Sequence, residues 1–302
     1  MAIVLQESLR GLFYAPFYLA LARDEFARAG VEVTFASAPR PGDAALGLFT
    51  GTVDVCWGGP MRVMETYQIR PDCDLVSFAE VVTRDPFLLV GRGPRAGFSP
   101  ADLVSLRLGS VSEVPTPWMC LQEDVRRAGA DPARISRVAD RSMADNAAAL
   151  KRGEIDVVQL FEPFVSELLE DPAYHIWYAQ ADRGPTSYTT FYTRRPTLAT
   201  RRDELLRMVR AIHHTQTIVA NLTGADIAAA IASYFPDVPA ARLATACARY
   251  KALGIWGATP VLPRAGYDRL LASLVSGAFV SPGTPFEVAV DNSLAEAVLT
   301  PS

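Results

Sequence analysis

The stretch Leu48-Phe-Thr-Gly-Thr-Val-Asp-Val-Cys-Trp-Gly-Gly-Pro60 decides how this chain folds. A helical pattern over residues 43–49 runs into it, and Gly51 can take the left-handed conformation that closes a helix. A short apolar strand is expected over residues 53–56, and regular structure is expected to stop where two glycines and a proline follow a tryptophan. An aromatic ring beside bare glycine backbone suits a ligand site, although a buried tryptophan at a tight turn explains the same pattern. The candidate binding residues here are Trp57, Gly58 and Gly59.

A second copy of the pattern, Leu-x-x-Gly-x-(Val/Ile)-Asp-Val with a proline after the strand, runs from Leu150 to Pro163. Both copies indicate a helix, a glycine turn, an aspartate and a short buried strand, so we expect two similar α/β lobes. In open α/β sheets the ligand lies outside the carboxyl ends of the strands. Residues 57–59 and 161–163 would then face one another across a cleft.

Length and composition are those of an ordinary soluble globular chain. The 302 residues can form one large or two medium domains, and 50% of them are hydrophobic while 21% are charged. The net charge of −4 offers no basic surface for nucleic acid, and no apolar run is long enough to span a bilayer. The four cysteines form no CxxC pair. We therefore expect no zinc site, no disulfide framework and no cofactor.

The first residues bear on the location of the protein. The chain enters an expected strand at residues 2–6 without the basic, apolar and small-residue segments of a signal peptide. Two alternatives fit this start. The protein is periplasmic or otherwise extracytoplasmic if a leader was removed, and cytoplasmic if the start is natural.

An aromatic loop follows the first strand. It precedes a helix expected over residues 16–29, with a proline in the first turn and Gly30 past the end, and then a strand over residues 31–35. This order predicts a parallel β-loop-α-β unit whose loop lies at the carboxyl end of the strand. Its aromatic side chains either line a cleft or pack against the helix start. They are Phe13, Tyr14 and Phe17.

Two segments have the pattern of crossings between lobes. Residues 84–87 combine charge and proline between strands expected at 75–82 and 87–90, and residues 188–192 alternate β-formers before a mostly helical tail. We expect lobe I to contain residues 1–86 and 190–302, with the tail packed on it, and lobe II to contain residues 87–189. Each lobe is predicted to be a mostly parallel sheet flanked by helices.

The loop at residues 112–118 precedes a helix that ends near Gly129. Free backbone N–H groups and the helix dipole favour an anion there, and Ser112 and Thr116 add hydroxyl groups. Glu113 in the same loop disfavours a strongly anionic ligand.

No catalytic motif is visible. The chain lacks G-x-S-x-G, P-loop, GxGxxG and HExxH patterns, and its three histidines are best explained as structural residues. A binding cleft remains, with an inferred lining that is aromatic and acidic. Aromatic faces hold flat rings, and carboxylates accept hydrogen bonds from amino groups. A flat, nitrogen-bearing heterocycle therefore fits better than a sulfonate or nitrate, with Glu162 the preferred carboxylate.

The complete set of candidate ligand-binding residues combines the loops, the strand ends and the crossings. It consists of Phe13, Tyr14, Phe17, Trp57, Gly58, Gly59, Glu80, Arg84, Ser112, Glu113, Thr116, Trp118, Phe161, Glu162 and Tyr188.

Several of these segments resemble a known family. The matching stretches are Tyr14-Ala-Pro-Phe-Tyr-Leu-Ala20, Gly30-Val-Glu-Val33, Phe49-Thr-Gly-Thr-Val-Asp-Val55 and Gly153-Glu-Ile-Asp-Val-Val-Gln-Leu-Phe-Glu-Pro163. They are similar to the type 2 periplasmic-binding-protein fold. The branch is the one that includes nitrate, taurine and alkanesulfonate receptors and the thiamine-pyrimidine receptors and synthases. The order Asp102-Leu-x-Ser-Leu-Arg-Leu-Gly-Ser110 and the ending Trp256…Tyr267-Asp-x-Leu…Gly277 are also similar to that branch, so the resemblance covers nearly the whole chain.

The resemblance implies a two-lobed, monomeric receptor that closes on a small molecule and delivers it to the permease of an ATP-driven importer. Two crossing strands would act as the hinge, and closure would create a shape that the importer can read. Ligand contacts in this family correspond here to residues 13–17, 57–60, 112–118 and 161–163. A thiamine precursor is one ligand of the expected kind.

Alternatives to a receptor stay open. The pyrimidine synthases of this branch carry a cysteine cluster and a histidine in the pocket, and this chain has no such cluster. An enzyme on the same fold, pyrimidine-forming or resembling an aromatic-acid decarboxylase, is the first alternative. A cytoplasmic small-molecule sensor is the second, and a sulfonate-type or nitrate-type anion is the alternative ligand.

Overall fold

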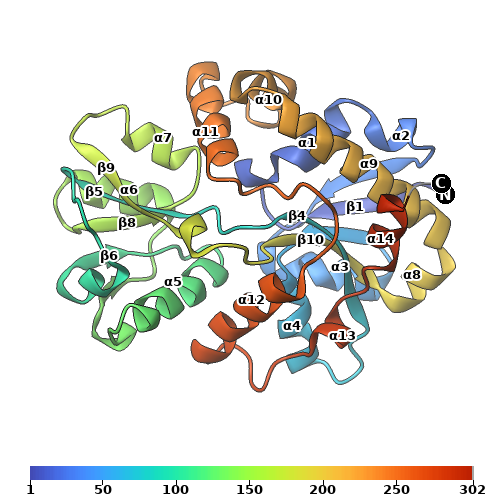
Figure 1. The fold of residues 1–302 in the computed structure, drawn as a ribbon, viewed down its shortest axis with the longest axis horizontal. Helices are drawn as coiled ribbons and strands as arrows, with labels where there is room; N and C mark the ends of the chain where they lie inside the picture. Colours follow the sequence, from blue (N-terminus) through green and yellow to red (C-terminus); the bar gives the residue numbers. More distant parts are fainter. Residues whose placement is uncertain (301–302) are drawn as a thin grey trace.

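Two five-stranded sheets organise the computed structural model, which describes residues 1–300, and helices flank each sheet to form one lobe (Figure 1). Sheet A has the strand order β2-β1-β3-β10-β4, and sheet B has the order β7-β6-β8-β5-β9. In each sheet one strand runs antiparallel to both neighbours, β10 in sheet A and β5 in sheet B. That strand is the first one after the chain crosses from the other sheet. The predicted two-lobed, mostly parallel α/β architecture is confirmed.

Lobe I is built around sheet A. Its strands are β1 Ile3–Glu7, β2 Val33–Ser37, β3 Val55–Gly58, β4 Leu75–Val82 and β10 Thr189–Arg194. The helices between them are η1 Leu12–Tyr14, α1 Ala15–Ala22, α2 Glu25–Arg28, η2 Pro41–Asp43, α3 Ala44–Thr50 and α4 Pro60–Ile69, where η denotes a short 3-10 helix.

Lobe II is built around sheet B. Its strands are β5 Leu88–Arg92, β6 Arg107–Gly109, β7 Ser136–Val138, β8 Val157–Leu160 and β9 Tyr174–Ala179. Its helices are η3 Pro100–Ser105, α5 Thr116–Arg127, η4 Pro132–Arg134, α6 Met143–Lys151, α7 Phe164–Leu168 and η5 Gln180–Arg183.

The chain after β10 is helical and covers lobe I. Its elements are α8 Arg195–Thr200, α9 Arg202–Asn221, α10 Gly224–Ile231, η6 Ala232–Tyr234, α11 Ala240–Ala252, α12 Arg264–Ser276, α13 Phe286–Ala289 and α14 Ser293–Leu299. Helices α9 and α10 pack on α1 while α13 and α14 pack on β4, as predicted for a tail on this lobe. Helices α11 and α12 also reach lobe II, where they contact α7 and α5 (Figure 1). None of the described helices is long and apolar enough to cross a membrane.

The repeated sequence pattern marks the same local structure in both sheets. The glycine after each helix, Gly51 and Gly153, has a left-handed backbone with φ of 72° and 74°. The aspartate that follows accepts a hydrogen bond from the neighbouring strand, Asp54 from the Val4 N–H and Asp156 from the Arg107 N–H, both at 2.8 Å. These aspartates fix the register at the amino ends of β3 and β8. The opposite, carboxyl ends of β3 and β8 face the space between the lobes.

Two local expectations are wrong. Regular structure does not stop at Trp57, because Trp57 and Gly58 complete β3 through pairing with β10, and α4 begins at Pro60, where a missing N–H costs nothing. The helix expected over residues 16–29 is also interrupted. Asp24 has a positive φ of 54°, which ends α1 and starts the separate short helix α2.

The two crossing segments run side by side between the sheets. The Thr186 N–H donates to the Thr83 carbonyl at 2.7 Å, and the Tyr188 N–H donates to the Val82 carbonyl at 2.9 Å. The chain leaves sheet A after Val82 and rejoins it at Thr189. The residue boundaries proposed for the two lobes from the sequence stay a prediction.

Candidate ligand-binding site

A cavity of about 50 Å³ lies where the crossing segments meet both lobes. Lobe I contributes the loop after β1, the helix η1 and the start of α4, and lobe II contributes the start of α5 and the end of β8. The lining residues are Ser8, Leu9, Phe13, Tyr14, Pro41, Gly59, Met61, Arg62, Phe87, Val114, Thr116, Phe161 and Tyr188.

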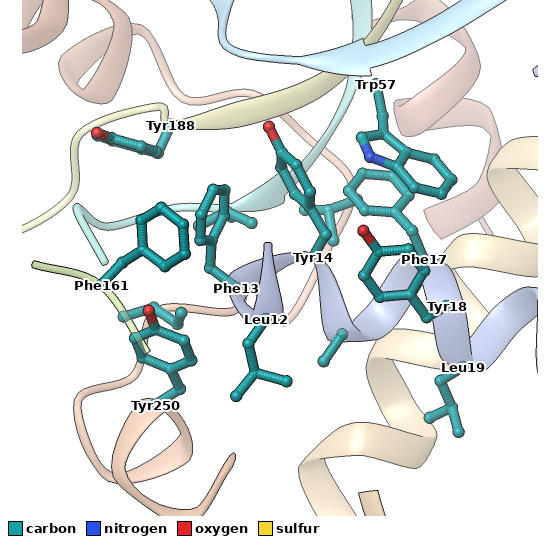
Figure 2. Close-up of a cluster of buried hydrophobic side chains, with 14 of the residues drawn as sticks. Leu12, Phe13, Tyr14, Phe17, Tyr18, Leu19, Trp57, Phe161, Tyr188 and Tyr250 are labelled. Carbon is teal, nitrogen blue, oxygen red and sulfur yellow. The ribbon is translucent and has the colours of Figure 1, made fainter. Parts of the chain in front are cut away.

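Aromatic side chains from three parts of the chain line the cavity, and Figure 2 shows Phe13, Phe161 and Tyr188 gathered in one cluster. The Phe13 ring of lobe I meets the Phe161 ring of lobe II nearly at right angles, with the ring centres 5.4 Å apart. From the crossings, Phe87 lies 5.4 Å from Phe161 and Tyr188 lies 6.4 Å from Phe13, again edge to face. A flat, apolar ligand ring can take the place of one protein ring in such a pair.

Hydroxyl groups supply most of the polar lining. The Ser8 hydroxyl lies 3.2 Å from the Tyr14 hydroxyl, and burial raises the pKa of Tyr14 to about 12, so that the phenol keeps its proton. The Tyr188 hydroxyl is buried and has no hydrogen-bond partner among the described residues. A buried donor without a partner is costly.

Two helices begin at the cavity, one from each lobe. Helix α4 starts at Pro60, beside the lining residues Gly59 and Met61, and α5 starts at Thr116. The first N–H groups of a helix have no partner within it, and the helix dipole places partial positive charge there. Both helix starts favour electronegative ligand groups.

The structure brings some of the predicted site residues together and places others elsewhere. Those that line the cavity are Phe13, Tyr14, Gly59, Thr116, Phe161 and Tyr188. Those that do not line it are Phe17, Trp57, Gly58, Glu80, Arg84, Ser112, Glu113, Trp118 and Glu162. A role in binding stays a prediction for the first group. For the second, the contacts described below point to structural roles.

Trp57 lies in the core of lobe I rather than at the cavity (Figure 2). Its fully buried ring is stacked between Phe17, 4.5 Å away, and Phe35, 5.1 Å away. Gly58 lies next to it, and a Cβ there would lie 3.3 Å from both Ser8 and Tyr192. The sequence left two explanations for this stretch, a ligand site and a buried tryptophan at a tight turn. The position of Trp57 in the core fits the buried tryptophan.

The two acidic loop residues are engaged in protein contacts. Glu162 is fully buried and accepts hydrogen bonds from the Arg249 guanidinium at 2.6 Å and from the Ser166 N–H at 2.8 Å. Glu113 accepts from the Met143 N–H at 2.9 Å, at the start of α6. The two carboxylates that the sequence assigns to ligand amino groups are therefore bound to other parts of the protein.

The remaining predicted residues lie in lobe I, at the crossing and in lobe II. Glu80 is buried in β4, and burial raises its pKa to about 8. Arg84 donates to the Ala181 carbonyl across the crossing at 3.4 Å. Ser112 donates to the Arg141 carbonyl at 2.8 Å. The ring of Trp118 packs under Arg137, whose guanidinium carbon lies 4.2 Å from the ring centre.

Sequence reasoning missed the cationic side chain of the site. Arg62 lies in the first turn of α4, three residues after Gly59, and its side chain is 17% exposed. A helix that starts at the carboxyl end of β3 places its first turn beside the ligand site. This rule could have identified Arg62 from the sequence. Phe87 was expected only as part of a crossing, and Ser8 and Met61 carried no signal of their own. The described residues contain no cluster of histidine, cysteine and acidic groups that could hold a metal.

Comparisons with known proteins agree with the fold. The chain is similar to "Putative binding protein YtlA" of Bacillus subtilis (strain 168), 24% identical over 294 residues that cover 97% of this chain and 88% of YtlA. The periplasmic aliphatic sulphonate binding protein SsuA of Escherichia coli superposes with a TM-score of 0.77 at 14% identity, covering 96% of this chain and 92% of that one. The periplasmic nitrate-binding protein NrtA of Synechocystis PCC 6803 gives 0.70 at 10% identity, covering 98% and 87%.

These likenesses show a periplasmic-binding-protein fold. A family model described as NMT1/THI5 like matches residues 13–221, which is more than half of the chain. The chain therefore belongs to the NMT1/THI5-like family.

Proposed function

We propose that this protein is the solute-binding component of an ABC-type importer and captures a small, flat ligand between its two lobes. The observation that carries the proposal is the cavity at the crossings, which both lobes build and which aromatic rings line. The structures that share the fold include proteins named for binding sulfonate and nitrate, and YtlA is also named as a binding protein. These likenesses support the same function.

The rings favour a flat ligand. Phe13 and Phe161 approach from opposite lobes, so a ring placed between them would contact both lobes at once and hold them together. The present cavity of about 50 Å³ has room for only a few water molecules. Ligand entry therefore requires the lobes to separate, and closure on the ligand gives the permease a distinct shape to recognise.

The predicted chemistry of the ligand needs revision. The sequence favours a nitrogen-bearing heterocycle held by carboxylates, but Glu162 and Glu113 bind other parts of the protein. Flatness is the part of that prediction that the geometry supports. A thiamine precursor remains one flat candidate. A receptor of this kind acts outside the cytoplasm beside its permease, and that location belongs to the proposal.

Native mass spectrometry of the purified protein tests the proposal. Closed receptors retain ligand, so denaturing the protein should release a small molecule that isothermal titration then shows to rebind with one-to-one stoichiometry. The titration panel should include pyrimidines, sulfonates, nitrate and aromatic acids. Absence of binding across the panel would count against a receptor. Recovery of a chemically altered product in place of the added ligand would favour the enzyme alternative.

A further inference from the structure

The charge in the cavity belongs to Arg62. Among the described residues that line the cavity it is the one charged side chain. Its guanidinium forms an ion pair with Glu65, one turn further along α4, and both side chains are partly exposed, at 17% and 24%. The protein therefore presents a cation, and no lining carboxylate, to the space between the lobes.

Most of the hydrogen-bonding capacity of Arg62 is unused. An arginine has five N–H donors in a planar fork that matches the two oxygens of a carboxylate. In the part of the chain that the structure describes, the guanidinium donates to one acceptor, Glu65, through one terminal nitrogen. The remaining donors are available to a ligand. Glu65 acts on the same helix as a partner that a ligand can replace.

The hydroxyl groups that line the cavity can donate hydrogen bonds as well. The Ser8 hydroxyl lies 3.2 Å from the Tyr14 hydroxyl, and the Tyr14 phenol keeps its proton because burial raises its pKa. The starts of α4 and α5 add backbone N–H groups and positive dipole ends, one from each lobe. A cavity rich in donors, with a cation and without a carboxylate, is complementary to an acceptor-rich anionic group.

We propose that the ligand is a flat anion, a ring that carries one carboxylate or sulfonate group, and that Arg62 binds this group while Phe13 and Phe161 hold the ring. The inference rests on the proposed function and adds the charge of the ligand to it. It reverses the sign expected from the sequence, where acidic residues would have selected an amine. Bidentate geometry fits both anions, so their relative affinities are left to measurement.

A matched set of ring compounds tests the inference by isothermal titration. Benzoate, benzenesulfonate and benzamide have similar shapes, but only the first two carry a negative charge. We expect the wild-type protein to bind at least one of the anions about 10-fold to 100-fold more tightly than benzamide, the range of a charge-assisted hydrogen bond. Arg62→Gln should abolish this preference, so that the anions and benzamide bind with similar affinity.

Two further variants keep the test interpretable. Glu65→Gln leaves Arg62 in place without its partner and should tighten binding of the preferred anion several-fold. Arg70→Gln is the control. Arg70 follows the same helix and pairs with Asp72 outside the cavity, so its loss should change no affinity. Thermal melting of every variant confirms that the fold is intact.

The outcomes separate the inference from the proposed function. Equal affinity for benzamide and the anions, or an unchanged preference in Arg62→Gln, overturns the anion inference and leaves a receptor for flat ligands. Failure of all three compounds to bind at millimolar concentration overturns it too. Failure of the wider titration panel, together with no ligand released in native mass spectrometry, overturns the proposed function itself.

Discussion

Glu80 is a buried acid whose charge the protein does not neutralise. Its side chain is 2% exposed in β4, and one carboxyl oxygen has no hydrogen-bond partner among the described residues. Burial raises its pKa from 4.5 to about 8, and the neighbouring residues Ser187 and Thr83 lower it only in part. The folded protein therefore keeps a proton that the unfolded chain loses above about pH 4.5.

This difference sets a pH dependence of stability. Between about pH 4.5 and pH 8 the folded state binds the extra proton, so its stability should fall as the pH rises, by at most about 1.4 kcal/mol per pH unit. Glu80→Gln removes the group that ionises and should flatten the profile, so that the variant is more stable than wild type at pH 8 and similar below pH 4.5. Urea unfolding at pH 4, 6 and 8 measures this. Parallel profiles for the two proteins would contradict the assignment.

Trp57 gives a second test at a single residue. Its ring is fully buried between Phe17 and Phe35, so Trp57→Ala should lower the free energy of unfolding by about 3–5 kcal/mol. Denaturant unfolding measures the loss. Phe161→Ala serves as the comparison, because it removes a cavity ring and should weaken ligand binding. A Trp57→Ala protein that folds normally but loses its ligand would restore the role expected from the sequence.

Helices α7 and α11 connect the lobes beside the cavity. Glu162 directly follows Phe161 and pairs with Arg249 of α11 at 2.6 Å, while its backbone N–H donates to the Tyr250 hydroxyl at 2.8 Å. Arg242, one further α11 residue, pairs with Glu167 and Glu170, whose side chains are about half exposed. The buried pair is therefore the part of this connection that a mutation should affect most.

We expect Arg249→Met to destabilise the protein by about 3–5 kcal/mol, because it leaves the Glu162 carboxylate buried without its cation. The double variant Glu162→Gln/Arg249→Met should regain much of that loss. Arg242→Gln, the control at an exposed pair, should cost about 1 kcal/mol or less. Chemical unfolding of all three variants gives the comparison. A double variant as unstable as Arg249→Met would show that the charge is not the cause.

The sequence predicted the helices and strands more accurately than the chemistry of the ligand site. The reason is that helices and strands depend on local signals, whereas the site depends on residues far apart in the chain. Glycine turns and the aspartates before β3 and β8 are local signals, and they identified the repeat and the fold. The role of Glu162 depends on Arg249, which lies 87 residues away. Whether Arg62 faces the cavity depends in the same way on how α4 packs. Propensity could not reveal the positive φ of Asp24, which interrupts the first helix.

At the scale of the whole molecule, the lobes are joined in several places. The two crossing segments, the α7–α11 contact and the α5–α12 contact all bridge them, and the cavity between the lobes has a volume of about 50 Å³. A ring-sized ligand must therefore wait for an opening event before it can bind.

Association kinetics should reveal this opening. The observed rate should level off as the ligand concentration rises, because opening then limits binding. Trp256 offers a reporter, since its indole N–H donates to the Phe13 carbonyl at 2.9 Å. Stopped-flow fluorescence with the ligand recovered by native mass spectrometry measures the rate. A linear rise up to millimolar ligand would instead indicate a cavity that is open before binding.

The position of β10 has a consequence for how the chain matures on the ribosome. Residues 189–194 form an inner strand of sheet A, between β3 and β4, whereas sheet B uses only the continuous run from Leu88 to Ala179. Domains usually fold in the order in which they are synthesised. Here the part of the protein that emerges first must wait, with the inner edges of β3 and β4 unpaired, until the second sheet has been made. During that wait the nascent chain exposes strand edges that invite aggregation, so the lobe that begins the chain is the last to be finished.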